Sequence, residues 1–176
     1  MDYSKILGDK YSEIEKKAKK IKLVLTDNDG VLTDTGVYYS SKGEEFKRFS
    51  IRDGMGVERL LSEVNIETGI ITGEISGPVK KRAEKLGITE LHIGIKEKHK
   101  LFPSILKDRN MLAENIAYIG DDYNDLEIIK LVGLSACPID AVPAIKDLVD
   151  YICTNKGGNG AFRDFAELII HFNQKQ

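Results

Sequence analysis

Short apolar runs alternate along this chain with amphipathic segments whose apolar residues recur at helical spacing. The runs predict buried strands over residues 21–27, 66–72, 91–94, 116–120, 134–137 and 151–153. The amphipathic segments predict helices over residues 53–64, 76–86, 98–109, 126–132 and 162–172, the first with Asp53 as its N-cap. Strands that alternate with helices form parallel sheets with right-handed crossovers. The pattern therefore predicts a Rossmann-like α/β fold with helices on both faces of the sheet.

Two regions lie outside this alternation. Residues 36–50 hold two β-rich runs, Val37–Tyr39 and Phe46–Phe49, around a glycine-containing loop over residues 40–44, which predicts a hairpin. Because an isolated hairpin is marginal in water, we expect it to cover the nearby strand end as a flap or to pack against another subunit. Residues 1–20 form a charged N-terminal extension, in which 9–20 predict a surface helix.

The composition narrows the classes of protein that remain. The 176 residues are 41% hydrophobic and 31% charged, which predicts one globular domain over 1–176. A net charge of -2 gives no basic field for nucleic acid or a membrane surface. Cys137 and Cys153 lie in apolar segments without CxxC spacing, which favours buried free thiols. No bilayer-length apolar run or signal-like N-terminus is seen, so we expect a cytoplasmic protein.

Two carboxylates end the first predicted strand. Asp27 and Asp29 follow the apolar run Leu23–Leu25, and Gly30 comes next. At the carboxyl end of a central strand, such side chains lie where open α/β sheets bind ligands. Their mutual repulsion is relieved by a cation such as Mg²⁺. A simple polar turn is the alternative interpretation of this stretch.

Three later segments bring polar side chains to the same edge of the predicted sheet. Thr72 ends the second strand, Lys98 begins the helix after the third, and Asp121 follows the fourth with Asp122 and Asp125. Because the carboxyl ends of parallel strands share one edge, we expect these groups to converge on the first pair of carboxylates. Each group alone has a simpler explanation, such as a turn, a solvated charge run, an N-cap or a surface position.

The converging groups predict a particular chemistry. Their oxygen ligands favour a hard divalent cation, Mg²⁺ rather than Zn²⁺. An aspartate at such a site can take a phosphoryl group and release it to water. The Thr72 hydroxyl, the Lys98 ammonium and backbone N–H groups near Asn28 and Thr72 can stabilise the charge on the transferred group. We therefore expect phosphomonoester hydrolysis.

Four motifs resemble, in order and spacing, those of the haloacid dehalogenase superfamily. They are LTDNDGVLTD, IITGE, the Lys98 segment and IGDDYND, and the similarity covers about residues 21–165. The resemblance implies that Asp27 is the nucleophile and Asp29 the general acid/base. It implies that Thr72 and Lys98 bind the phosphoryl group. The implied Mg²⁺ ligands are Asp27, Asp121 and the backbone carbonyl of Asp29. The implied supporting residues are Asp122 and Asp125.

Three further stretches, DGVLTD, IRDGMGVERL and GGNGAFRD, are similar to the capless sugar-acid phosphatases of that superfamily. This group has no cap domain and acts on 3-deoxy-D-manno-octulosonate 8-phosphate or on nonulosonate and acylneuraminate 9-phosphates. Members that resemble this chain form homotetramers in which a neighbour closes each site. A capless site needs such a neighbour to exclude water. The resemblance thus implies two partners, a sugar acid phosphate and further copies of this chain.

Several residues bear on which sugar acid is bound. Arg52 and Arg163 are candidates for the substrate carboxylate, since arginine binds carboxylates bidentately, although exposed arginine is also common. Glu74 stands where octulosonate phosphatases often carry arginine, and with Lys85 it favours the nine-carbon substrates. Asn28 replaces a usual apolar residue, and we expect its side chain to point away from the two carboxylates.

Three other functions remain possible at this point. One is a phosphatase of broad specificity for small phosphate esters. Another is a receiver-like phospho-acceptor domain, but receivers place the acceptor aspartate after a later strand than the metal-binding pair. The third is a silent regulatory domain, against which the intact Asp27, Asp29 and Asp121 argue.

Overall fold

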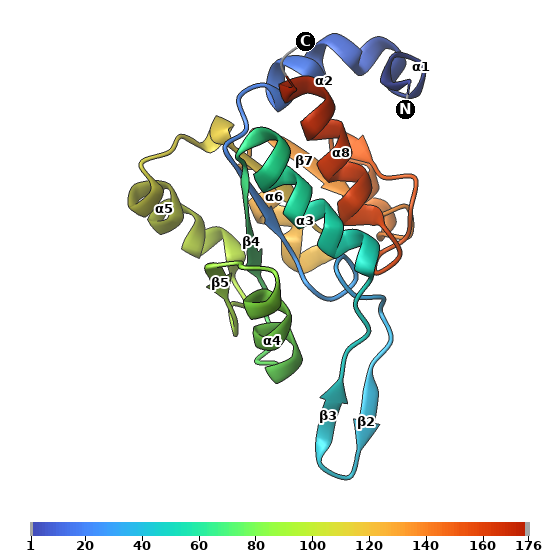
Figure 1. Cartoon of the computed structure of the whole chain (residues 1–176), viewed down its shortest axis with the longest axis vertical. Coiled ribbons are helices and arrows are strands. Elements are labelled where there is room, and N and C mark those ends of the chain that lie inside the picture. The colour runs from blue at the N-terminus through green and yellow to red at the C-terminus, as the bar shows by residue number, and fades with distance from the viewer. Residues whose placement is uncertain (1, 175–176) are drawn as a thin grey trace.

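The computed structural model describes residues 2–174 and has one parallel sheet at its centre (Figure 1). Its six strands lie in the order β5-β4-β1-β6-β7-β8. The strands are β1 Leu23–Thr26, β4 Glu67–Ile71, β5 Glu90–His92, β6 Ile116–Ile119, β7 Leu134–Cys137 and β8 Tyr151–Ile152. All neighbours pair in parallel, and β1 lies between β4 and β6. This is the strand order of the doubly wound Rossmann fold, with a topological switch point beside β1, and it confirms the predicted fold class.

Helices cover both faces of the sheet. The helices are α1 Tyr3–Leu7, α2 Tyr11–Ala18, α3 Ile51–Val64, α4 Gly77–Lys85, α5 Lys98–Arg109, α6 Leu126–Ile129, α7 Pro143–Lys146 and α8 Ala161–Asn173, with 3-10 turns η1 Gly8–Lys10, η2 Ala113–Asn115 and η3 Tyr123–Asp125. One apolar core joins the sheet to α3, α4 and α8, and a second joins it to α5, α6 and α7. The two termini of the described chain meet where Tyr3 packs on Phe172, at the end of the molecule opposite the hairpin (Figure 1).

The central strand shows why the sheet is buried on both faces. Val24 belongs to the first core, whereas Leu23 and Leu25 belong to the second, as the alternation of side chains along a strand requires. All four residues of β1 are buried. The apolar run therefore makes a strand that contacts helices on both sides, and its polar continuation emerges at the carboxyl edge.

The first turn of α3 differs from the sequence-based prediction. Ser50, not Asp53, is the N-cap, and its side chain accepts hydrogen bonds from the backbone N–H groups of Arg52 and Asp53. The Asp53 carboxylate is buried and accepts from the N–H groups of Gly160 and Arg163, both at 3.0 Å. Asp53 thus ties α3 to the start of α8, a long-range role that local helix signals do not reveal.

The hairpin is shorter than its sequence pattern suggests. β2 spans Tyr38–Ser40 and β3 spans Gly43–Phe46, and the pairing of Ser40 with Gly43 leaves only residues 41–42 in the loop. The predicted second strand, Phe46–Phe49, is wrong because the chain after Phe46 turns back to the body, where Phe49 bridges to Thr33. Figure 1 shows the hairpin extending away from the sheet.

Three helical details were not anticipated. Helix α1 and the short α7, which begins at Pro143, were not predicted. Helix α6 ends at Ile129 rather than 132, because the Gly133 N–H turns to donate to the carbonyls of Ala113 and Ile116. The predicted surface helix over 9–20 is present as α2 and the preceding turn.

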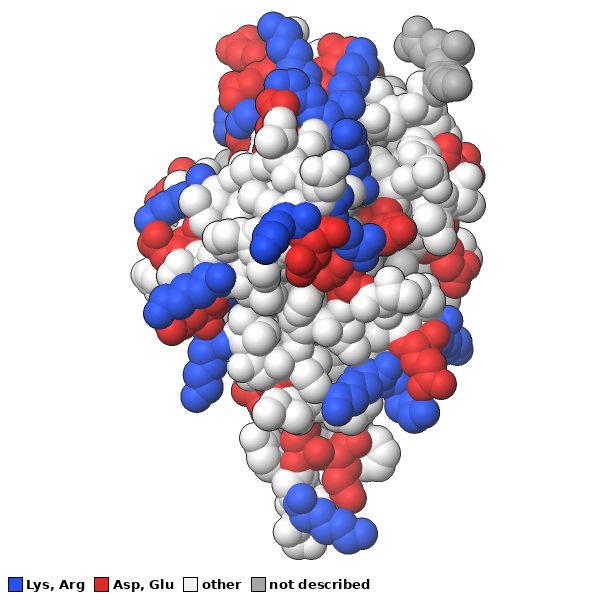
Figure 2. Space-filling view, turned by 90° about the vertical axis from the view of Figure 1, so that its left-hand side faces the viewer, with Lys and Arg blue, Asp and Glu red and all other residues white. Residues whose placement is uncertain are grey.

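Two observations on the described residues concern the apolar length of the helices and the distribution of surface charge. None of the helices is long and apolar enough to cross a lipid bilayer. On the face that carries α4 and α5, basic and acidic side chains are interspersed over most of the surface, and basic side chains adjoin one another toward its upper end (Figure 2).

Candidate active site

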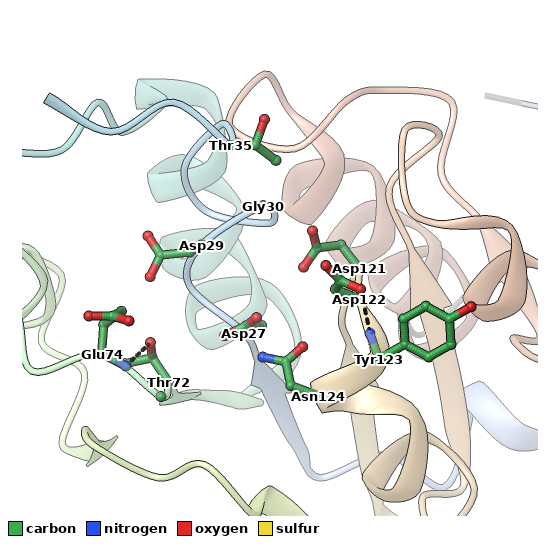
Figure 3. Close-up of a pocket in the computed structure, with 11 residues that line it drawn as sticks. Asp27, Asp29, Gly30, Thr35, Thr72, Glu74, Asp121, Asp122, Tyr123 and Asn124 are labelled. Carbon is green, nitrogen blue, oxygen red and sulfur yellow. Dashed lines mark hydrogen bonds between the residues drawn. The ribbon is translucent and has the colours of Figure 1, made fainter.

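A cavity of about 470 Å³ opens at the carboxyl ends of β1, β4 and β6. It is lined by residues from three loops: Asp27, Asp29, Gly30, Thr35, Thr72, Gly73, Glu74, Asp121, Asp122, Tyr123 and Asn124. Figure 3 shows Asp27 at the floor, with Thr72 and Glu74 on one side and Asp121 and Asp122 on the other. The cavity therefore lies at the switch point of the sheet, where open α/β folds bind ligands.

Asp27 is held by β1 and by a buried lysine. Its backbone N–H continues the β1–β6 pairing by donating to the carbonyl of Ile119 at 3.0 Å. The Nζ atom of Lys98 lies 2.8 Å from Oδ1 of Asp27, and both side chains are buried. Burial raises the pKa of the Asp27 carboxyl and the nearby Asp125 charge adds to the rise, whereas Lys98 opposes it. Lys98 thus provides the positive charge that favours the ionised form of this buried carboxylate against the effects of burial and of Asp125.

Asp125 organises the site without facing the cavity. Its Oδ1 accepts from Lys98 at 2.5 Å and from the Tyr118 hydroxyl at 2.6 Å. Its Oδ2 accepts from the backbone N–H groups of Asp121 and Asp122. Burial works against the charge of Lys98, but the Asp27 and Asp125 carboxylates outweigh it and raise the lysine pKa. Because both carboxylate oxygens are engaged, Asp125 holds its neighbours in place, and its support of a metal site stays a prediction.

Asp121 has the features of a cation ligand. Carboxylate oxygens of Asp27, Asp121 and Asp125 lie within 4.8 Å of one another. Asp121 Oδ1 is buried and has no hydrogen-bond partner within residues 2–174. Burial together with the Asp27 charge raises the pKa of Asp121 to about 8. A Cβ on Gly30 would lie 2.0 Å from Asp121 Oδ2, so this carboxylate fits only against a glycine. An unpartnered buried oxygen among anionic neighbours fits a hard divalent cation held by Asp27 and Asp121.

The two carboxylate oxygens of Asp29 differ in their hydrogen bonds. Asp29 Oδ1 accepts from Lys47 at 2.5 Å, from Asn28 Nδ2 at 3.1 Å and from Thr33 Oγ1 at 3.3 Å. Asp29 Oδ2 is buried and has no hydrogen-bond partner among the described residues. The expectation that Asn28 points away from the carboxylates is wrong, because its amide is a donor to Asp29.

Thr72 and the loop after β4 form the other wall. The Thr72 N–H donates to the carbonyl of His92 at 2.9 Å, so it is not a free donor toward the cavity. Asn28 N–H likewise donates to Asp27 Oδ1 at 2.7 Å. The Thr72 hydroxyl accepts from the Glu74 N–H at 3.2 Å and lines the cavity (Figure 3). The hydroxyl, rather than either of these backbone groups, is therefore available to a phosphoryl oxygen.

The residues expected to bind the sugar acid are not brought together within one chain. Glu74 lines the cavity, whereas Arg52, Lys85 and Arg163 do not. Arg52 is exposed at the start of α3, and Lys85 is exposed at the end of α4. Arg163 Nε lies 2.7 Å from Glu167. Their roles toward a substrate remain predictions.

Sequence reasoning missed several residues at the site. Tyr118 and Lys47 were not singled out, and neither were the cavity-lining Thr35, Tyr123 and Asn124. For Tyr118, the signal was a hydroxyl group within an otherwise apolar strand. For Tyr123 and Asn124, the signal was their place inside the acidic motif that follows β6.

Comparison with known proteins agrees with this geometry. A family model described as haloacid dehalogenase-like hydrolase matches residues 81–163. The 3-deoxy-D-manno-octulosonate 8-phosphate phosphatase of Escherichia coli strain K12 is 38% identical over 159 residues, which are 90% of this chain and 84% of that protein. The corresponding protein of Haemophilus influenzae is 36% identical over 162 residues, which are 92% of this chain and 89% of that protein.

Solved structures are similar over the same length. The Yersinia pestis 3-deoxy-D-manno-octulosonate 8-phosphate phosphatase has a TM-score of 0.87 and 37% identity, covering 92% of this chain and 86% of that one. The Moraxella catarrhalis enzyme, in complex with a magnesium ion, a phosphate ion and KDO, also has a TM-score of 0.87 and 37% identity, covering 92% of each chain. The cobalt-bound Haemophilus influenzae enzyme has a TM-score of 0.85 and 36% identity, covering 89% of this chain and 91% of that one.

Fold, site and relatives define a haloacid dehalogenase-like phosphoric monoester hydrolase, whose cluster of Asp27, Asp121 and Asp125 fits a divalent cation. Within that superfamily, the chain belongs to the capless sugar-acid phosphatase group.

Proposed function

We propose that this chain hydrolyses a 3-deoxy-keto sugar acid phosphate, with 3-deoxy-D-manno-octulosonate 8-phosphate as the first candidate. The observation that carries the proposal is the pairing of buried Asp27 with Lys98 next to Asp121, whose Oδ1 has no partner. This arrangement combines a nucleophile paired with a lysine and a cation site at one end of a cavity. The similarity to octulosonate phosphatases supports the choice of sugar acid.

In the proposed mechanism, a carboxylate oxygen of Asp27 attacks phosphorus and the bond from phosphorus to the sugar oxygen breaks. Asp29 gives its proton to the departing sugar alkoxide. Water then attacks the aspartyl phosphate, its proton passes to Asp29, and inorganic phosphate leaves with Asp27 restored. Lys98 and the Thr72 hydroxyl stabilise charge on the phosphoryl oxygens. Mg²⁺, when held by Asp27, Asp121 and the backbone carbonyl of Asp29, would neutralise negative charge on the phosphoryl oxygens.

The proposal includes two sugar acids of different chain length, with eight or nine carbons. Glu74 lines the cavity and can accept hydrogen bonds from sugar hydroxyls, which favours a nonulosonate or acylneuraminate 9-phosphate as the alternative substrate. Against this, relatives such as those of Escherichia coli and Haemophilus influenzae are named for the eight-carbon acid. The two substrates therefore have to be compared directly.

Site closure by a second copy of the chain is also part of the proposal. The hairpin and the start of α3 leave large apolar side chains exposed, including Tyr39, Phe46 and Ile51, whose exposed fractions are 74%, 68% and 84%. Such a surface favours association. In a homotetramer, Arg52, Lys85 or Arg163 of a neighbouring copy could reach the open cavity and meet the substrate carboxylate.

The test is a comparison of kcat/KM with Mg²⁺ for octulosonate 8-phosphate, a nonulosonate 9-phosphate and simple sugar phosphates, with chelated enzyme as control. We expect activity only with the metal, and a preference for one of the two sugar acids by at least about tenfold, or about 1.4 kcal/mol. Equal kcat/KM on all esters would reject the sugar-acid assignment in favour of a broad phosphatase. Sedimentation velocity of the same sample tests the tetramer.

A further inference from the structure

Lys47 lies at the root of the hairpin, just after β3, and its side chain is buried. Only 2% of it is exposed, and its Nζ lies 2.5 Å from Asp29 Oδ1 and 3.0 Å from Glu44 Oε1. A buried ammonium group is costly unless it is paired, so its two carboxylate partners hold it in place. The hairpin is thereby linked through one side chain to the carboxylate expected to move protons.

The hydrogen bonds of Asp29 all fall on one of its two carboxylate oxygens. Lys47, Asn28 and Thr33 all donate to Oδ1. Oδ2 has no partner, and Asp29 lines the cavity (Figure 3). Rotation of the carboxylate would exchange the two oxygens and break these bonds. The three donors therefore hold the carboxylate in one orientation, with Oδ1 bonded and Oδ2 buried.

We propose that Lys47 is a positioning residue that orients Asp29 for proton transfer to the leaving oxygen, so that the hairpin root sets the efficiency of that step. This inference rests on the proposed function, specifically on Asp29 as general acid. A sugar alkoxide is a poor leaving group and needs that proton, whereas p-nitrophenolate leaves without it. The dependence of the rate on the leaving group therefore reports the orientation of Asp29.

The neighbouring Arg48 provides a matched control. Its guanidinium donates to Asp34 at 3.1 Å, to the Gly158 carbonyl at 3.1 Å and to Asn159 at 3.0 Å. It anchors the same hairpin root to the glycine-rich loop but makes no hydrogen bond to Asp29. A general loosening of the hairpin is thus separable from the loss of Asp29 positioning.

The experiment measures single-turnover rates of phosphoryl transfer to the enzyme from an alkyl sugar phosphate and from p-nitrophenyl phosphate, both with saturating Mg²⁺. The variants are Lys47→Met, Lys47→Gln, Lys47→Arg, Arg48→Met and, as reference, Asp29→Asn. We expect Lys47→Met and Lys47→Gln to slow the alkyl ester by about 10²-fold, the lower end of general acid catalysis, and the aryl ester far less. Lys47→Arg should recover part of the difference, and Arg48→Met should affect both esters equally.

The outcomes separate the inference from the function on which it rests. If Asp29→Asn discriminates between the two esters but both Lys47→Met and Lys47→Gln slow them equally, the positioning role of Lys47 is wrong and the general acid remains. If Asp29→Asn itself does not discriminate, its acid role fails and the inference fails with it. Selective loss in the Lys47 variants and in Asp29→Asn, but not in Arg48→Met, supports the proposal.

Discussion

The Lys98 ammonium lies 2.8 Å from Asp27 and 2.5 Å from Asp125, and so joins residues from β1, α5 and the turn after β6. All three side chains are buried: the exposed fraction is 0% for Lys98, 5% for Asp27 and 0% for Asp125. One cation balances two buried anions, and a third carboxylate, Asp121, lies beside them. This surplus of negative charge is what a divalent cation would neutralise.

Removal of the lysine charge should destabilise the fold as well as abolish activity. In Lys98→Met, two buried carboxylates lose their counter-charge, and we expect a loss of about 3–5 kcal/mol in the free energy of unfolding. Urea denaturation at pH 7 measures it. Lys100→Met is the control, because Lys100 makes only an exposed pair with Glu97 and its loss should change stability by less than about 1 kcal/mol. Equal stability of both variants would contradict the buried charge network.

Replacement of the nucleophile should stop the reaction and leave the fold in place. In Asp27→Asn, the amide has the same shape but cannot attack phosphorus, so we expect kcat to fall by roughly 10⁴-fold or more. Steady-state kinetics with circular dichroism as a check of folding test this. Asp108→Asn, an exposed position on α5, should retain the parent rate. Parent activity in Asp27→Asn would remove Asp27 as the nucleophile.

Binding of the cation should stabilise the folded chain. Mg²⁺ that binds only the folded state raises the free energy of unfolding by about 2.7 kcal/mol at a hundred times its Kd. We expect Tm to rise with Mg²⁺ concentration in the parent protein and in Asp108→Asn. In Asp121→Asn the rise should be lost, because a neutral amide replaces the carboxylate whose Oδ1 has no partner among the described residues. An undiminished shift in that variant would place the cation elsewhere.

The pair between Glu90 and Arg109 should make stability depend on pH in the acid range. Burial works against the Glu90 charge, but hydrogen bonds from His92 and Arg109 outweigh it and hold the pKa below the ordinary 4.5. Because the folded-state pKa is the lower one, the stabilisation is present above pH 4.5 and is lost as pH falls through the folded value. Glu90→Gln should therefore be less stable than the parent at pH 7, with a gap that narrows below pH 4.5. Urea denaturation at several pH values measures the gap, with the exposed Glu97→Gln as control, and a gap independent of pH would contradict the pairing.

Local patterns anticipated much of this protein because the period of apolar residues reports which face of an element is buried. The helix predicted over 98–109 agrees with α5 at both ends, and the strand predicted over 116–120 differs from β6 by one residue. The four motifs likewise predicted that Asp27, Thr72, Lys98 and Asp121 would meet, since the carboxyl ends of parallel strands share one edge.

Other features were decided only when distant segments packed together. Asp53 has the local signature of an N-cap, yet it binds the start of α8, more than a hundred residues away along the chain. Lys47 sits between Phe46 and Arg48 with no local sign of burial, and its partner Asp29 belongs to a different loop. Sequence alone determined most of the strands and the longer helices, and which edge gathers the acids, because those depend on local periodicity. Only the tertiary structure decided which charges pair, because pairing depends on distances of a few ångströms between elements that no local pattern encodes.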